Sequence, residues 1–178
     1  MFKVLYPYEY VDSVFSIDYK KLYDRGYRAL IFDIDNTLVP HGKDSTEEVD
    51  KLFRDIQGIG FQTFILSNNS DARIKRFLKN IESPYIYDAQ KPKVDNYLKA
   101  IEMLKVKKEE AVFIGDQIFT DIYGANKCGI PNILVKFIRR KDEKKIGIRR
   151  NIEKVILKFY QWNKRCQNRL GGIQKKEI

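Results

Sequence analysis

The sequence predicts an α/β protein, a three-layer α/β/α sandwich in which helices cover both faces of a mostly parallel sheet. Short apolar segments of strand length alternate with segments whose apolar residues recur at helical spacing, and such alternation is typical of βαβ crossovers. Polar residues follow three of the predicted strands, at Asp33, Ser67 and Asp116. Because ligands bind outside the carboxyl ends of parallel strands, these residues indicate one site.

Five strands are predicted from short apolar runs. The first covers 27–33 and ends in the carboxylate of Asp33, and the second covers 61–66 and stops at Ser67. The other three are predicted at 85–87, 111–114 and 132–135. Strands of a covered parallel sheet are buried on both faces, which fits their largely apolar composition.

Five helices are predicted from apolar residues spaced three and four apart. In the helix at 45–56, Ser45 or Thr46 is expected to cap the first turn, and Gly58 and Gly60 are expected to end it. The other helices are predicted at 71–80, 93–104, 121–128 and 149–170. The aromatic residues between 2 and 23 are expected to serve packing, and no helix or strand is assigned to them.

The bulk properties describe a soluble globular protein. A chain of 178 residues suits one domain with one core, and its mean hydropathy is −0.47. The longest apolar runs fall far short of the roughly 20 residues that a bilayer crossing needs. The N-terminus shows no apolar stretch of a secretory signal, so we expect a cytoplasmic protein. Cys128 and Cys166 are expected to be reduced thiols.

The positive charge lies at the C-terminal end of the chain. Of a net charge of +10, residues 136–178 contribute +11, from fifteen basic and four acidic residues, and residues 1–135 contribute −1. Attraction to an anionic partner should therefore come from the C-terminal segment. We divide the chain into a catalytic domain at 1–148 and a basic amphipathic helix and tail at 149–178.

The first predicted strand is followed by two carboxylates, Asp33 and Asp35. Two carboxylates crowded at a strand end repel one another unless a cation lies between them. Hard oxygen ligands of this kind suit Mg²⁺, which binds through one or two carboxylates together with a substrate phosphate. A second acidic group, Asp116 and Asp121, follows the fourth strand and can complete the metal shell.

A hydroxyl and a cation lie between the two acidic groups in the sequence. Ser67 follows the second strand, and Lys91 precedes Pro92. Both can neutralise the charge of a phosphoryl group. The single histidine, His41, lies in the loop after the first acidic group, where it is either solvated or a substrate contact.

In their order along the chain, these residues resemble the four motifs of the haloacid dehalogenase superfamily. The first motif is similar to Asp-x-Asp-x-Thr and the fourth to Gly-Asp-x-x-x-x-Asp; in this sequence the motif residues are Asp33, Asp35 and Thr37, then Ser67, then Lys91, then Gly115, Asp116 and Asp121. The resemblance spans about residues 27–135 and implies a haloacid dehalogenase-like Rossmannoid fold with a bound Mg²⁺.

The resemblance also implies a role for each motif residue. Asp33 would attack phosphorus to form an aspartyl-phosphate, and Asp35 would protonate the leaving oxygen and later deprotonate water. Substrate contacts are implied for Thr37, Ser67, Asn68 and Lys91, with Lys91 also stabilising charge in catalysis. Metal binding is implied for the Asp33 carboxylate, the Asp35 backbone carbonyl, Asp116 and, in support, Asp121.

Many members of the superfamily insert a cap domain over the site, and this sequence has no room for one. One predicted helix and one predicted strand account for the length of each stretch where a cap could be inserted, residues 38–66 and 68–90. The motif details Asp-Asn-Thr-Leu-Val, Ser-Asn-Asn, Ala-Gln-Lys-Pro and Gly-Asp-Gln-x-x-Thr-Asp resemble the YqeG family of capless class IIIA phosphatases. That family is similar to the mitochondrial phosphatidylglycerophosphate phosphatases.

The leading hypothesis is therefore a Mg²⁺-dependent phosphatase for phosphatidylglycerophosphate. An alternative is a phosphatase for a soluble or nucleic-acid phosphomonoester, and another is a non-catalytic module bound to a ribosome or RNA. The intact acidic set with Lys91 argues against the last. The C-terminal helix either packs on the sheet or docks on an anionic membrane, on the inner face of the cell membrane; nucleic acid is the less favoured partner.

Overall fold

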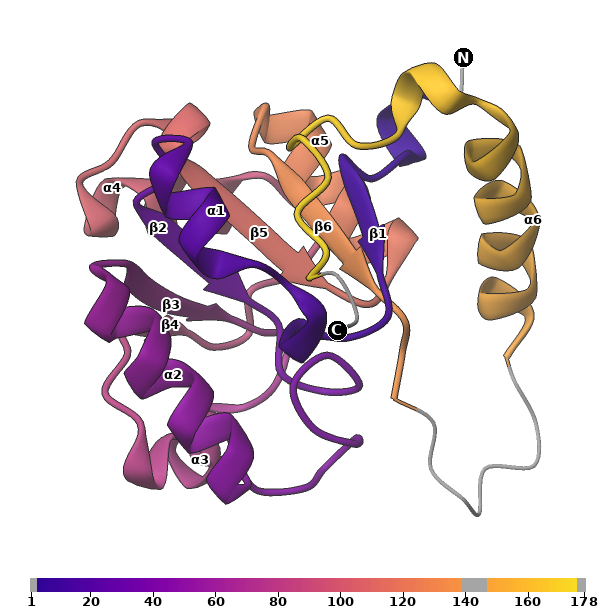
Figure 1. Cartoon of the computed structure of the whole chain (residues 1–178). Helices are drawn as coiled ribbons and strands as arrows, with labels where there is room; N and C mark the ends of the chain where they lie inside the picture. The colour runs from indigo at the N-terminus through magenta and orange to yellow at the C-terminus, as the bar shows by residue number, and fades with distance from the viewer. Residues whose placement is uncertain (1–2, 139–146, 176–178) are drawn as a thin grey trace.

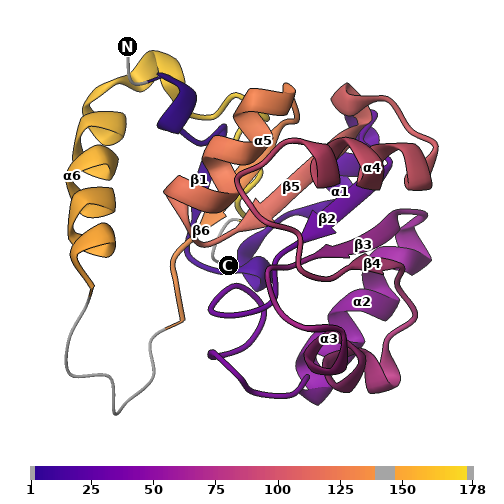
Figure 2. The same cartoon turned by 180° about the vertical axis from the view of Figure 1, so that it is seen from behind.

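The structure is a computed structural model that describes residues 3–138 and 147–175. Within these residues, a single sheet of six parallel strands lies between two layers of helices (Figures 1 and 2), which confirms the predicted fold class. The strands are β1 (Glu9–Val11), β2 (Ala29–Phe32), β3 (Gln62–Leu66), β4 (Tyr85–Ile86), β5 (Ala111–Gly115) and β6 (Asn132–Val135). Their spatial order is β1-β6-β5-β2-β3-β4.

Helices cover both faces of this sheet. The helices are α1 (Tyr19–Asp24), α2 (Glu47–Ile59), α3 (Asp71–Phe77), α4 (Asp95–Leu104), α5 (Tyr123–Cys128) and α6 (Ile148–Trp162). Figures 1 and 2 show α1 and α2 on one face, α4 and α5 on the other, and α6 beside the β1 edge. Successive residues of β2 point to opposite faces, with Leu30 and Phe32 in one core and Ala29 and Ile31 in the other.

The loops after β2 and β3 stay short. Residues 38–66 hold α2 and β3, and residues 67–90 hold α3 and β4. Both stretches are described without gaps, and neither contains a further domain. The predicted absence of a cap is confirmed, so no inserted domain covers the carboxyl edge of the sheet.

The predicted interior elements are found with small shifts of their ends. Thr46 caps α2 by accepting a hydrogen bond from the Val49 amide. Gly60 ends α2 in the left-handed region at φ 116°, whereas Gly58 lies inside the helix, so Gly58 was wrongly expected to end it. The aromatic N-terminal stretch contains β1 and α1, which were not predicted. A three-residue strand such as β1 is defined by its pairing with β6, a contact between distant parts of the sequence.

The predicted helix at 149–170 ends earlier, at Trp162. The chain then turns back along the N-terminal segment: the amides of Leu170 and Gly172 donate to Glu9 Oε1 at 3.1 and 3.0 Å. Leu170 and Ile173 are buried in the larger core. Residues 170–173 are thus packed into the body, and the division at residue 148 stays a prediction.

The apolar stripe predicted on the C-terminal helix lies mostly on the outside of α6. Ile156 and Tyr160 face the body, together with the carboxylate of Glu153. The outward residues are about half or more exposed: Ile152, Val155, Phe159 and Trp162. Within residues 3–138 and 147–175, none of the helices is both long enough and apolar enough to span a membrane.

The buried C-terminal segment makes a stability prediction. Ile173→Ala should lower the free energy of unfolding by about 2–5 kcal/mol, because it leaves a cavity in the core. Ile152→Ala, at a half-exposed position on α6, is the matched control and should change it by about 0.5 kcal/mol or less. Urea unfolding of both variants checks this. Equal losses would contradict the packing of the tail into the core.

Candidate active site

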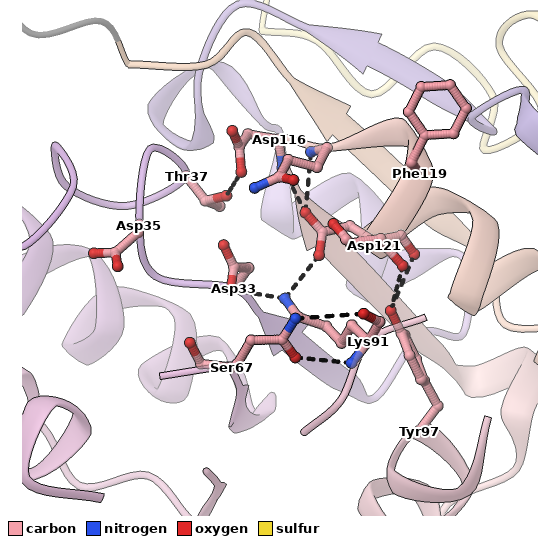
Figure 3. A network of polar contacts seen from close by, with 12 residues as sticks. Asp33, Asp35, Thr37, Ser67, Lys91, Tyr97, Asp116, Phe119 and Asp121 are labelled. Atoms are coloured by element: carbon pink, nitrogen blue, oxygen red, sulfur yellow. Dashed lines mark hydrogen bonds and ion pairs between the residues drawn. The ribbon is translucent and has the colours of Figure 1, made fainter. Parts of the chain in front are cut away.

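The sheet gathers the predicted site residues at one edge. Asp33 follows β2, Ser67 follows β3 and Asp116 follows β5, and these three strands are neighbours in the order β5-β2-β3. Figure 3 shows the three side chains converging there. A cavity of about 170 Å³ opens at this edge, lined by Asp33, Asp35, Asn36, His41, Ser67, Asn68, Asn69, Lys91, Gln117 and Thr120.

Three buried carboxylates form the centre of the site. One oxygen from each of Asp33, Asp116 and Asp121 lies within 4.8 Å of the other two. Burial raises the pKa of Asp33 to about 6 against the opposing charge of Lys91. Burial likewise raises the pKa of Asp116 to about 7, with Arg150 opposing. Ionisation of these buried carboxyl groups therefore costs free energy, and a further cation in the cluster would reduce that cost.

Lys91 joins two of these carboxylates. Its Nζ lies 2.7 Å from Asp33 Oδ1 and 2.7 Å from Asp121 Oδ1. Burial acts to lower the pKa of Lys91, but the two carboxylates outweigh it and the pKa is raised, so Lys91 is a permanent cation. Asn68 Oδ1 accepts a hydrogen bond of 2.8 Å from the Lys91 amide. The structure thus gives the Asn68 side chain an orienting contact with Lys91.

Asp121 organises the loop that carries Asp116. Asp121 Oδ2 accepts hydrogen bonds from the amides of Asp116 and Gln117 at 3.1 and 3.0 Å. The approach is close: a Cβ on Gly115 would lie 2.5 Å from the Asp121 carboxyl group, so only glycine fits there. Ile118–Ile122 form one π-helical turn, a feature often found at functional sites.

Thr37 and Ser67 complete the wall of the site. Thr37 Oγ1 donates to Asp116 Oδ1 at 3.1 Å and fixes that carboxylate. Ser67 is fully buried beside the cavity, and its hydroxyl oxygen accepts from the Asn69 side chain at 2.9 Å. Substrate contacts of both residues stay predictions.

Asp35 is directed away from the carboxylate cluster (Figure 3). It accepts hydrogen bonds from the Gly42 amide, Asn69 Nδ2 and Arg73 Nη2 at 3.0, 2.9 and 2.9 Å. Burial acts to raise its pKa, but these hydrogen bonds outweigh burial and lower the pKa below its ordinary value. Asp35 still lines the same cavity as Asp33.

Several side chains at the site were not predicted. Asn69 and Arg73 hold Asp35, and Arg150 of α6 pairs with Asp116. His41 Nδ1 lies 3.2 Å from Asp35 Oδ2 at the cavity wall. Charged residues within predicted helices are usually solvated, so the sequence carried no signal for Arg73 or Arg150.

The donor set fits a magnesium ion. Three clustered carboxylates are hard oxygen ligands of the kind that Mg²⁺ prefers. Asp33 and Asp116 would contribute ligand oxygens directly. Asp121 already uses one oxygen for Lys91 and the other for two amides, which fits the supporting role predicted for it.

Comparison with known proteins identifies the class that this fold and site define. A family profile described as haloacid dehalogenase-like hydrolase matches residues 41–129, which include Ser67, Lys91, Asp116 and Asp121. The chain belongs to this hydrolase family. It is 35% identical over 156 residues to the "Probable phosphatase YqeG" of Bacillus subtilis (strain 168), a match that covers 87% of this chain and 91% of the relative.

Solved structures agree on the fold. An uncharacterized protein from Listeria monocytogenes serotype 4b is 19% identical with a TM-score of 0.54, covering 75% of this chain and 99% of that one. A hypothetical protein from Xanthomonas campestris is 15% identical with a TM-score of 0.51, covering 80% and 89%. These structures confirm the predicted fold, and the family profile and the Bacillus subtilis relative confirm the predicted haloacid dehalogenase-type enzyme.

The raised carboxylate pKa values predict how stability depends on pH without metal. A group with a raised pKa in the folded state stabilises the fold below its unfolded pKa and loses this contribution as pH rises through the folded pKa. In EDTA, Asp33 and Asp116 should therefore lower the melting temperature by more than about 5 °C between about pH 4 and pH 7. Added Mg²⁺ should restore it at pH 7.

The variant Asp116→Asn tests the origin of this pH dependence. Its melting temperature in EDTA should fall less between pH 4 and pH 7 than that of the wild type, because one buried carboxylate is gone. Asp24→Asn, at an exposed carboxylate on α1, should behave as the wild type does. If all three proteins showed the same dependence of melting temperature on pH, ionisation of the buried carboxyl groups would not be what lowers the stability.

Proposed function

We propose that this protein is a Mg²⁺-dependent phosphatase that hydrolyses phosphate monoesters through an aspartyl-phosphate on Asp33. The observation that carries the proposal is the position of Lys91 between Asp33 and Asp121, with Asp116 alongside. This arrangement supports a reaction that uses Asp33 as nucleophile, Lys91 as a fixed cation and the carboxylate cluster as a metal site. Membership of the hydrolase family and the relative named as a probable phosphatase support it.

The first half of the reaction transfers the phosphoryl group to Asp33. A carboxylate oxygen of Asp33 forms a bond to phosphorus while the bond from phosphorus to the leaving oxygen breaks. The leaving oxygen takes a proton from Asp35. Because hydrogen bonds from Gly42, Asn69 and Arg73 stabilise the Asp35 carboxylate, the acid step requires a protonated Asp35 that has given up part of these contacts.

The second half releases phosphate. Asp35, now ionised, takes a proton from a water molecule, whose oxygen bonds to phosphorus while the bond to Asp33 breaks. The hydrogen bonds that lower the pKa of Asp35 keep it ionised at the start of this step, but they also make it a weaker base, so part of them must again be given up as the proton is taken. Lys91 stays charged throughout and stabilises the phosphoryl oxygens, where most of the catalysis of phosphoryl transfer arises.

The metal would be held by the carboxylates of Asp33 and Asp116 and the backbone carbonyl of Asp35. When bound, Mg²⁺ neutralises charge on the phosphoryl group and aligns it with the nucleophile. Thr37 fixes Asp116 for this purpose, and Asp121 holds the loop that carries it.

We further propose that the substrate is a lipid, phosphatidylglycerophosphate. A site without a cap does not enclose a small metabolite, which favours a bulky substrate. The outer face of α6 exposes Phe159 and Trp162 beside exposed basic residues of the helix and the following turn, which are Lys154, Lys158, Lys164 and Arg165. Such a surface complements an anionic membrane, so we propose a peripheral position on the inner face of the cell membrane.

The nucleophile is tested by replacing Asp33. Asp33→Asn should lower the turnover of p-nitrophenyl phosphate by at least about 10³-fold, because it removes the attacking oxygen while keeping the shape of the side chain. Asp24→Asn should keep full activity. Asp35→Asn should slow alkyl phosphates more than aryl phosphates, since poor leaving groups need the proton most. Near-normal turnover by Asp33→Asn would contradict the role of Asp33 as the nucleophile.

The membrane-docking part has its own test. The double variant Phe159→Ser and Trp162→Ser should bind phosphatidylglycerol vesicles at least about 10-fold more weakly and still hydrolyse p-nitrophenyl phosphate, since neither side chain lines the catalytic cavity. Met103→Ser, at an exposed apolar residue of α4, is the matched control. Vesicle binding should weaken as salt rises. Unchanged binding by the double variant would exclude this face as the docking surface.

A further inference from the structure

Two residues one turn apart on α6 contact the loop that carries Asp116. Arg150 forms an ion pair with the Asp116 carboxylate, and its Nη1 also donates to the Asp116 carbonyl at 2.6 Å. Glu153 Oε1 accepts hydrogen bonds from the amides of Ile118 and Phe119 at 2.8 and 3.3 Å. We call Arg150 and Glu153 the α6 clamp.

The members of the α6 clamp also hold one another. Glu153 Oε2 lies 3.1 Å from Arg150 Nη1, and the Arg150 guanidinium lies 4.8 Å from the centre of the Phe137 ring. The side chains of Arg150, Glu153 and Asp116 are 18%, 7% and 0% exposed. Charge-assisted hydrogen bonds shielded from water in this way are strong and directional.

The loop is held by carboxylates from two sides. On the inner side, Asp121 accepts from the amides of Asp116 and Gln117. On the outer side, Glu153 accepts from the next two amides, those of Ile118 and Phe119. Four consecutive amides of 116–119 are thus bound by two side chains, one from the loop itself and one from α6. The conformation of the loop depends on both.

We propose that Arg150 and Glu153 are positioning residues that fix Asp116 for metal binding and catalysis. Arg150 holds the carboxylate and carbonyl of Asp116, and Glu153 holds both Arg150 and the loop beyond it. Side chains that orient a metal ligand typically contribute 10–100-fold to metal affinity or activity. The inference rests on the proposed Mg²⁺-dependent reaction, and it makes α6 a part of the catalytic unit.

The test compares four variants: Arg150→Gln, Arg150→Lys, Glu153→Gln and, as the control, Arg149→Gln at an exposed position of the same helix. With p-nitrophenyl phosphate, Arg150→Gln and Glu153→Gln should lower kcat by about 10–100-fold and change KM less than about 3-fold. Calorimetric titration should show Mg²⁺ binding about 10-fold weaker. Arg149→Gln should match the wild type in both measurements.

The lysine variant separates position from charge. Lysine keeps the positive charge but lacks the planar fork that reaches a carboxylate and a carbonyl together. Arg150→Lys should therefore fall between Arg150→Gln and the wild type in kcat and in Mg²⁺ affinity. Full recovery by Arg150→Lys would mean that charge alone matters and would overturn the positioning role. If Arg150→Gln fails to fold, Arg150→Lys and Glu153→Gln decide by the same measurements.

Hydrogen exchange separates the α6 clamp from the proposed reaction. Glu153→Gln should speed exchange at the amides of Ile118 and Phe119 relative to Arg149→Gln, whatever the activity of the enzyme. A wild-type enzyme that needs no Mg²⁺ would refute the proposed function but leave this measurement valid. Wild-type exchange, kcat and Mg²⁺ affinity in folded Arg150→Gln and Glu153→Gln would overturn the inference.

Discussion

The catalytic edge of the sheet depends on the buried bridge from Lys91 to Asp33 and Asp121. Without this cation, two carboxylates would face one another away from water, and a buried charge without a partner is costly. The bridge also leaves the second oxygen of Asp121 free to bind the amides of Asp116 and Gln117. One lysine therefore pairs with Asp33 and, through Asp121, supports the loop that carries Asp116.

The site depends on α6 as well as on the sheet. The last described residues are held against the N-terminal segment through Glu9 and through the burial of Leu170 and Ile173. This returning segment follows α6, and α6 in turn holds Asp116 through Arg150. Packing far from the cavity thus supports the position of the Asp116 carboxylate through α6.

The two aspartates of the first motif lie in different surroundings. Asp33 is buried with one cation, and burial raises its pKa; Asp35 accepts several hydrogen bonds from the loop and from α3, and its pKa is lowered. Environments that shift the pKa values of two carboxyl groups in opposite directions commonly give the two groups different chemical roles. The separation arises from the burial of Asp33 and from the hydrogen bonds that Asn69, Arg73 and the Gly42 amide donate to Asp35.

The sequence by itself determined the parallel sheet and the convergence of Asp33, Ser67 and Asp116, because apolar periodicity and strand ends are local signals. Only the tertiary structure decided the rest. β1 was not predicted, since three residues become a strand only by pairing with β6. The contacts of Arg73 and Arg150 with site carboxylates were not predicted either, since a charged residue on a helix looks the same in sequence whether it meets water or a carboxylate. Such contacts join distant parts of the chain, and only the packed fold brings them together.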